Sequence, residues 1–85
     1  MNVSLVEMKA GQSGIISLIR GGPGFTAKLN QIGLREGKRI KKISSIFKRG
    51  PVTINVDNFQ VAVGYGKAIR IVVEVDNIET NSPGR

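Results

Sequence analysis

Residues 25–37 constrain the fold of this chain more than any other part of the sequence. Phe25, Leu29 and Ile32 recur at the spacing of one helical face, which predicts a helix of about two turns. Gly33 is a natural stop, because glycine adopts the left-handed geometry that ends many helices without a Cβ penalty, so we expect a positive φ there. Such a short helix has little stability alone and must pack against the rest of the domain.

Short runs of alternating apolar residues predict strands on both sides of this helix. Val52, Ile54 and Val56 share one face of a strand that Gly50-Pro51 opens, and Asp57-Asn58 fits a two-residue hairpin turn. The expected elements are strands over 13–19, 38–47, 52–56, 59–63 and 68–75, and the helix over 25–32.

Five short strands cannot bury two faces as an open sheet, whereas a small barrel removes most exposed edges. We therefore predict a mostly β fold, a small SH3-like barrel of about five strands with one short helix between the first two strands. Apolar residues in the strand over 38–47 do not alternate cleanly, which predicts a bulge near Lys41-Lys42. Residues 1–76 are expected to form this domain, and residues 77–85 a flexible C-terminal tail.

The chain contains neither Cys nor His, which removes several kinds of chemistry. No disulfide, thiolate nucleophile or His general base is available, and carboxylates alone select transition metals poorly. We therefore expect no enzymatic activity, no catalytic residues, no tight metal site and no cofactor. The apolar runs are shorter than the roughly 20 residues of a membrane span, and no signal-peptide pattern is present, so we expect a cytoplasmic protein without a membrane span.

The net charge of +7 is concentrated between residues 35 and 49. Such a stretch suits an acidic protein, an anionic surface or phosphates, and its side chains should be mostly exposed because burying an unpaired charge is costly. Recognition of bases also needs aromatic side chains, and only Phe47 is near in sequence, so nucleic acid is the less favoured partner. The candidate partner-binding residues are Lys28, Arg35, Lys38, Arg39, Lys41, Lys42, Lys48 and Arg49.

The order and spacing of several short motifs resemble those of the FeoA family, small cytosolic accessory proteins of ferrous iron transport. Leu29, Gly33, Leu34 and Gly37 match the family pattern L-x-x-x-G-[LI]-x-x-G. The resemblance implies an SH3-like fold that docks on the cytosolic part of FeoB, the membrane iron transporter with a G-protein domain. The structural motif residues are Phe25, Leu29, Ile32, Gly33, Leu34, Gly37, Gly50 and Pro51.

The resulting hypothesis is a non-enzymatic adaptor that docks on a FeoB-like transporter and modulates it. Binding would use an apolar patch beside the helix, which Phe25, Leu29 and Ile32 hold to the barrel, while basic residues steer association. Two departures from the family pattern affect partner contacts: Lys28 stands where an arginine is common, and Gly64-Tyr65-Gly66 replaces a common leucine-arginine pair. The alternatives are a small basic RNA-binding barrel and a metal-responsive regulatory module, and weak self-association stays open.

Overall fold

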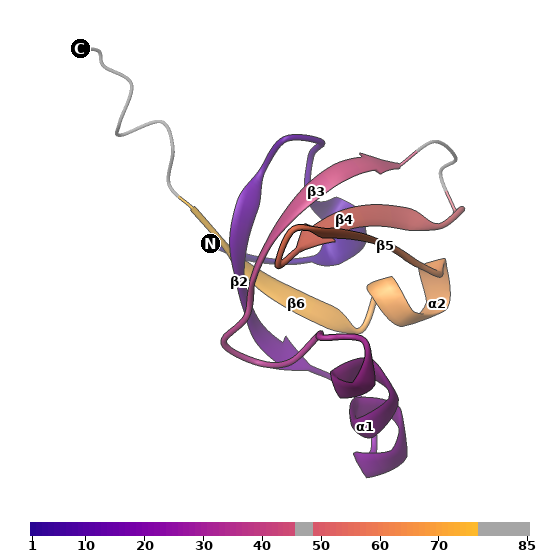
Figure 1. The fold of residues 1–85 in the computed structure, drawn as a ribbon. Helices are drawn as coiled ribbons and strands as arrows, with labels where there is room; N and C mark the ends of the chain where they lie inside the picture. Colours follow the sequence, from indigo (N-terminus) through magenta and orange to yellow (C-terminus); the bar gives the residue numbers. More distant parts are fainter. Residues whose placement is uncertain (46–48, 77–85) are drawn as a thin grey trace, which may run out of the picture.

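The computed structural model of the protein describes residues 1–45 and 49–76, and the expected C-terminal tail lies outside them. Along this part of the chain the elements follow one another as drawn in Figure 1. They are β1 (Asn2–Ser4), the 3₁₀ turn η1 (Leu5–Glu7), β2 (Ser13–Ile19), α1 (Pro23–Gln31), β3 (Arg39–Ser45), β4 (Val52–Val56), β5 (Phe59–Val63), α2 (Tyr65–Ala68) and β6 (Ile71–Val75). The strands form one antiparallel sheet in the order β1-β6-β2-β3-β4-β5.

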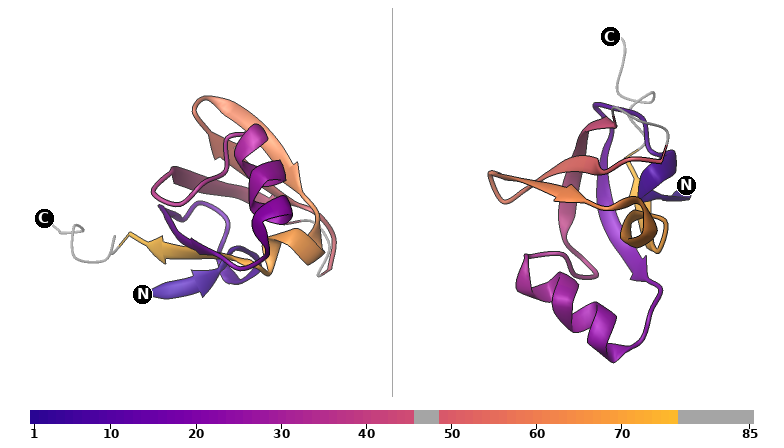
Figure 2. Two further views of the ribbon diagram at one scale, coloured as in Figure 1. Left: turned by 90° about the horizontal axis from the view of Figure 1, so that it is seen from below. Right: turned by 90° about the vertical axis from the view of Figure 1, so that its right-hand side faces the viewer.

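The sheet curls strongly, as the two views in Figure 2 show, and its inner face carries an aliphatic core. Inward-facing residues of the strands, among them Ile16, Ile40, Ile54 and Val73, are fully buried, and Leu29 of α1 joins them. Burial of these side chains supplies the main favourable term in folding. The prediction of a mostly β, SH3-like fold is thus confirmed.

The described residues contain one strand more than the five predicted. Strand β1 has three residues and pairs with β6, so that Val3 lies opposite Val73. A pairing between residues so far apart in the chain leaves no local signal in the sequence. With β1 counted, α1 lies between the second and third strands rather than between the first two.

The prediction of a strand over 68–75 is wrong for its first residues, where the chain completes the one-turn helix α2 and β6 has not yet begun. The carbonyl of Gly64 caps this turn by accepting a hydrogen bond from the Ala68 N–H at 2.8 Å. Ile69 follows the helical turn instead of continuing the alternation, so its side chain is 42% exposed.

Helix α1 ends in a Schellman motif, which accounts for the spacing of Leu29, Gly33 and Leu34. The Leu34 N–H donates to the Leu29 carbonyl at 2.9 Å, and the Gly33 N–H donates to the Asn30 carbonyl at 3.0 Å. Gly33 has a φ of 91°, so the predicted positive φ is confirmed. Both leucines are buried, and the motif therefore also fixes the helix against the core.

Two turns and one bulge lead the chain through β3, β4 and β5. Gly37, with a φ of 92°, donates its N–H to the Ile16 carbonyl at 2.7 Å and directs the chain into β3. The predicted bulge is confirmed, because the β3–β4 register shifts between Lys42 and Ser44. The predicted hairpin turn is confirmed too: Asp57-Asn58 has φ values of 50° and 70°, as a type I′ turn requires.

Candidate functional site

An apolar groove lies between the C-terminal end of α1 and the β4–β5 hairpin, with a volume of about 440 Å³. In the right-hand view of Figure 2, this end of the helix and the hairpin project on the same side of the molecule. Its two most exposed apolar side chains are Ile32, which is 49% exposed, and Phe59, which is 71% exposed. The lining residues are Gln31, Ile32, Gly33, Val56, Asp57, Phe59, Gln60 and Val61.

The two turns described above place the walls of this groove. A Cβ built on Gly33 would lie 3.9 Å from Cγ1 of Val56, so the end of α1 lies directly over the hairpin. Phe59 is the register partner of Val56 and therefore shares its face of the hairpin. The groove thus continues the core-facing side of the hairpin into solvent.

The expectation that Ile32 holds α1 against the barrel is wrong. Ile32 is the C-cap residue, with a φ of −102° and a ψ of 15°, and it lies half exposed outside the core cluster. Leu29 is only 1% exposed and anchors the helix. Phe25 packs partly buried against the core, with the Arg70 guanidinium 5.1 Å from its ring centroid. Ile32 is left to line the groove.

Two of the candidate basic residues are already paired with carboxylates. Lys38 Nζ lies 2.6 Å from the Asp57 carboxylate, and Arg39 pairs with Asp76 at 2.8 Å. Such partly exposed pairs contribute little to stability, but they reduce the charge that these two residues present to a partner. The other exposed candidates are Lys28, Arg35, Lys41 and Arg49, while Lys48 lies outside the described residues.

The expectation that Lys42 is exposed is wrong, since its side chain is 2% exposed. Its ammonium Nζ donates to the carbonyl oxygens of Leu5 at 3.2 Å, Val6 at 3.1 Å and Met8 at 2.6 Å. These carbonyls lie in and just after η1, and that of Leu5 also accepts a hydrogen bond from the Met8 N–H at 3.3 Å. Burial lowers the pKa of Lys42 below the usual lysine range. Lys42 is therefore a structural residue that joins β3 to η1.

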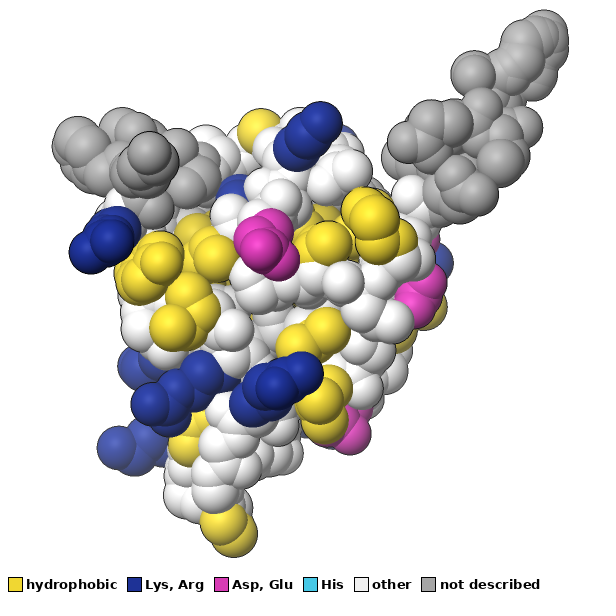
Figure 3. Space-filling view, turned by 180° about the vertical axis from the view of Figure 1, so that it is seen from behind, with side chains coloured by type: hydrophobic (Ala, Val, Ile, Leu, Met, Phe, Trp, Pro, Cys, Tyr) yellow, Lys and Arg dark blue, Asp and Glu magenta, His cyan; other side chains and the backbone are white. Residues whose placement is uncertain are grey.

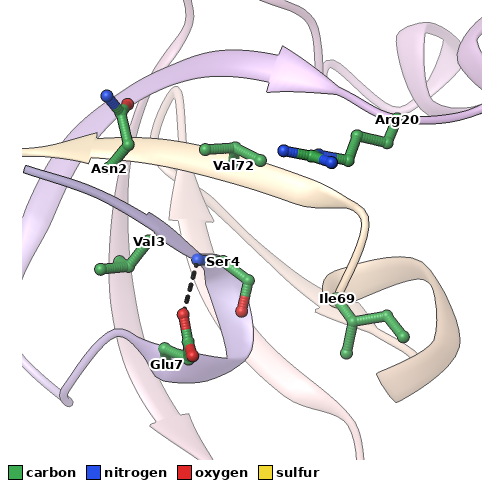
Figure 4. A pocket seen from close by; sticks show the side chains of 7 residues that line it. All are labelled: Asn2, Val3, Ser4, Glu7, Arg20, Ile69 and Val72. Atoms are coloured by element: carbon green, nitrogen blue, oxygen red, sulfur yellow. Dashed lines mark hydrogen bonds between the residues drawn. The ribbon is translucent and has the colours of Figure 1, made fainter.

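A second, more polar hollow lies beside β1 and the end of α2, with a volume of about 370 Å³. Figure 4 shows Arg20 extending toward Val72 across it, while the Glu7 carboxylate accepts a hydrogen bond from the Ser4 N–H at 3.2 Å. On the face drawn in Figure 3, hydrophobic side chains lie in small groups separated by acidic and basic ones. The polar hollow is lined by one large exposed apolar residue, Ile69, whereas the groove beside α1 is lined by two, which makes the groove the stronger candidate for a binding site.

Within residues 1–45 and 49–76, no group of three or more Asp and Glu side chains is placed to hold a metal ion. In the same part of the chain, no helix is long and apolar enough to cross a membrane.

A family model of the FeoA domain matches residues 3–75 of the chain. The chain belongs to the FeoA family. It is similar to a crystal structure of an iron uptake regulatory protein, FeoA, with 37% identity and a TM-score of 0.81 over 89% of this chain and 99% of that one. A candidate Fe(2+) transport protein A of Methanocaldococcus jannaschii is 33% identical over 70 residues, which are 82% of this chain and 83% of that protein.

The same fold occurs inside larger proteins. A manganese-dependent transcriptional repressor matches with a TM-score of 0.77 and 20% identity, over 85% of this chain but only 40% of that one. As a member of the FeoA family, the chain is a small protein related to ferrous iron transport.

The family motif and the groove meet at Gly33, but the sequence alone did not identify the other wall. Leu29, Gly33 and Leu34 build the end of α1, so the motif has a structural role. The sequence predicts a strand over 59–63 but does not single out Phe59 within it. The signal that could have singled it out is its place directly after the Asp57-Asn58 turn, at the tip of the hairpin.

Proposed function

We propose that this protein is a non-enzymatic, cytoplasmic accessory protein of ferrous iron uptake that docks on the cytosolic part of a FeoB-type transporter and modulates it. The observation that carries the proposal is the groove between the end of α1 and the β4–β5 hairpin. Two large apolar side chains, Ile32 from the helix end and Phe59 from the hairpin, line this groove and are exposed. Exposed apolar side chains around a concavity are typical of protein-binding sites. Family membership supplies the link to iron transport.

The distribution of charge supports a protein partner better than an RNA partner. The basic stretch is divided, because Lys42 is buried and both Lys38 and Arg39 already contact carboxylates. RNA binding by a small barrel needs a continuous basic surface with aromatic side chains for stacking. A docking partner needs only an apolar anchor and scattered cations that steer it, which the groove, Lys28 and Arg35 provide.

The first experiment measures binding of the full chain to the purified cytosolic domain of the FeoB-type transporter from the same organism, by isothermal titration calorimetry. Ile32→Ser and Phe59→Ser should each weaken binding at least about tenfold, as expected for apolar anchors in an interface. Ile69→Ser is the matched control, since Ile69 is about as exposed as Ile32 but lines the other hollow. Equal weakening by the control, or no binding by the unaltered chain, would overturn the proposal.

A kinetic measurement separates the charged residues from the groove. Lys41→Glu and Arg35→Glu should slow association with this domain more than they speed dissociation, and added salt should have the same effect because exposed charges are screened beyond about 8–10 Å. Lys42 is left unchanged in this measurement, because it is buried. Association rates unchanged by both variants in stopped-flow would leave the apolar groove as the docking determinant.

A further inference from the structure

Strand β5 forms a free edge of the sheet. It stands last in the strand order and pairs, among the described strands, with β4. Proteins usually protect such an edge with charged residues, proline or a bulge, because its backbone groups can pair with another chain. The strand reads Phe-Gln-Val-Ala-Val and keeps a regular register with β4 over its whole length. None of the usual protective devices is present in β5.

The hairpin turn determines which backbone groups face this edge. Val56 and Phe59 flank a two-residue turn and therefore form a hydrogen-bonded pair. Hydrogen-bonded and non-hydrogen-bonded pairs alternate along an antiparallel ladder, so Gln60 and Ala62 occupy non-hydrogen-bonded positions. Their N–H and C=O groups point away from β4. Outside the β-ladder, no hydrogen bond within residues 1–45 and 49–76 uses these two N–H groups.

The apolar groove adjoins this edge. Phe59 and Val61 lie on the core-facing side of β5, since their register partners on β4 are buried core residues. Side chains of a strand alternate between its two faces. In a strand added to β5, the residue opposite Val61 would therefore project into the groove, toward Ile32 of the opposite wall. Backbone pairing and an apolar pocket are thus available to the same ligand.

The charges near the groove favour an acidic ligand. Lys28 is exposed one helical turn before Ile32, and Arg35 is exposed just after the turn that ends the helix. Asp57 is the one carboxylate that lines the groove, and it is already paired with Lys38 at 2.6 Å. A segment with negative charges on either side of an apolar residue complements this arrangement.

We propose that the free edge of β5 accepts an extended, acidic segment of a partner protein as an added β-strand, with an aliphatic side chain of that segment seated in the groove beside Ile32 and Phe59. This inference rests on the proposed function and deepens it, because it names the kind of segment that the groove recognises. Main-chain hydrogen bonds give such a complex affinity, and the alternate side chain in the groove gives it specificity.

The test begins with a short synthetic peptide of alternating Glu and Val with Leu at its centre, added to the ¹⁵N-labelled full chain. Binding should slow hydrogen exchange at the Gln60 and Ala62 amides at least tenfold. Two further peptides carry N-methyl groups on alternate residues, so that one set blocks the amides facing β5 and the other blocks those facing away. Only one of the two methylated peptides should lose binding.

A variant of the protein tests the same hydrogen bonds from the other side. Ala62→Pro removes an N–H that points to the free edge, and should weaken peptide binding at least tenfold. Ala62→Ser keeps that N–H at the same exposed position and should bind like the unaltered chain. If Ala62→Pro disturbs the hairpin, the methylated peptides still give the answer on the unaltered protein.

Three results with the peptides would overturn the inference. They are no peptide binding at millimolar concentration, binding that both methylations affect equally, and binding without protection of the Gln60 and Ala62 amides. Protection that rises with the concentration of the protein alone would show a second copy as the occupant, which also contradicts the partner proposed.

The transporter domain then separates this inference from the proposed function. If the domain binds through Ile32 and Phe59 but leaves exchange at Gln60 and Ala62 unchanged, the edge pairing fails and the docking function stands. If the peptide adds as a strand but the transporter domain does not bind, the edge pairing stands and the docking function fails.

Discussion

The region around Lys42 and the groove beside Phe59 differ in how far their apolar side chains are buried. Around Lys42, the η1 segment covers the core, Leu5 and Met8 are buried, and the ammonium group satisfies three carbonyls. At the groove, the core-facing side of β5 extends into solvent and leaves Phe59 and Ile32 exposed. The first region is saturated with internal contacts, whereas the second keeps apolar surface available for a partner.

This difference separates stability from recognition. Substitutions in the first region should change the free energy of unfolding and affect binding only through loss of the fold. Substitutions in the groove should have the reverse pattern, because an exposed side chain contributes little to folding. The following predictions test that separation, beginning with the largest effect.

Two neighbouring lysines provide the sharpest comparison. Lys42→Glu places a carboxylate against three carbonyl oxygens, and should lower the free energy of unfolding by about 3–5 kcal/mol or unfold the domain. Lys41→Glu, on the exposed side of the same strand, should change it by about 0.5 kcal/mol or less. Guanidinium denaturation of both variants measures the two values, and similar values would refute the structural role of Lys42.

Two apolar residues of one helix end give the next comparison. Leu29→Ala should cost about 2–5 kcal/mol of unfolding free energy, because it empties a fully buried site. Ile32→Ala should cost less than about 1 kcal/mol, since this side chain already contacts solvent. Thermal and chemical denaturation of both variants would measure the two losses of unfolding free energy. A large loss for Ile32→Ala would mean that the groove wall belongs to the core.

A backbone substitution tests the turn that joins the helix to the groove. Gly33→Val should destabilise the domain by about 1–3 kcal/mol, because its φ of 91° strains a β-branched residue. Gly66→Ala in α2 is the control, since a Cβ there meets open space, and it should leave the melting temperature unchanged or raise it. An unchanged melting temperature for Gly33→Val would show that the turn tolerates other geometry.

The smallest effect is a dependence of stability on pH. Burial lowers the pKa of Lys42 in the folded state, so the unfolded chain binds more protons between that lowered value and the ordinary one. The contribution of Lys42 to stability should therefore increase as pH rises through that window. Guanidinium denaturation of the unaltered chain and Lys42→Met from pH 7 to 10 isolates this term. If the free energy of unfolding of the unaltered chain minus that of Lys42→Met stays constant or falls as pH rises, the predicted pH dependence is wrong.

Much of the fold follows from local patterns in the sequence. The spacing of Leu29 and Gly33 predicts the helix and its end, and Asp57-Asn58 predicts the hairpin turn, because each depends on residues close together in the chain. Strand β1 could not be predicted in this way, since its three residues gain their structure from β6. The alternation that suggested a strand at Ile69 was misleading, because a single helical turn also fits between Gly64 and β6.

The candidate site was predictable only in part. The sequence placed an apolar patch beside the helix, but it assigned Ile32 to the core and did not select Phe59. It also treated Lys42 like its basic neighbours. A charged side chain is expected to be exposed only when no buried hydrogen-bond acceptor is available to it. The carbonyls of residues 5, 6 and 8 that accept from Lys42 belong to a segment distant in sequence, so no local pattern predicts this contact.

The pairing of β1 with β6 has a consequence for the order of events during synthesis. Residues 2–4 cannot find their partners until residues 72–74 have been made, whereas the β4–β5 hairpin closes across a two-residue turn. Local contacts form before distant ones because closing a longer loop costs more entropy. We therefore expect a nascent chain to form the β4–β5 hairpin, with its β5 edge open to a partner or to aggregation, before its first strand is paired.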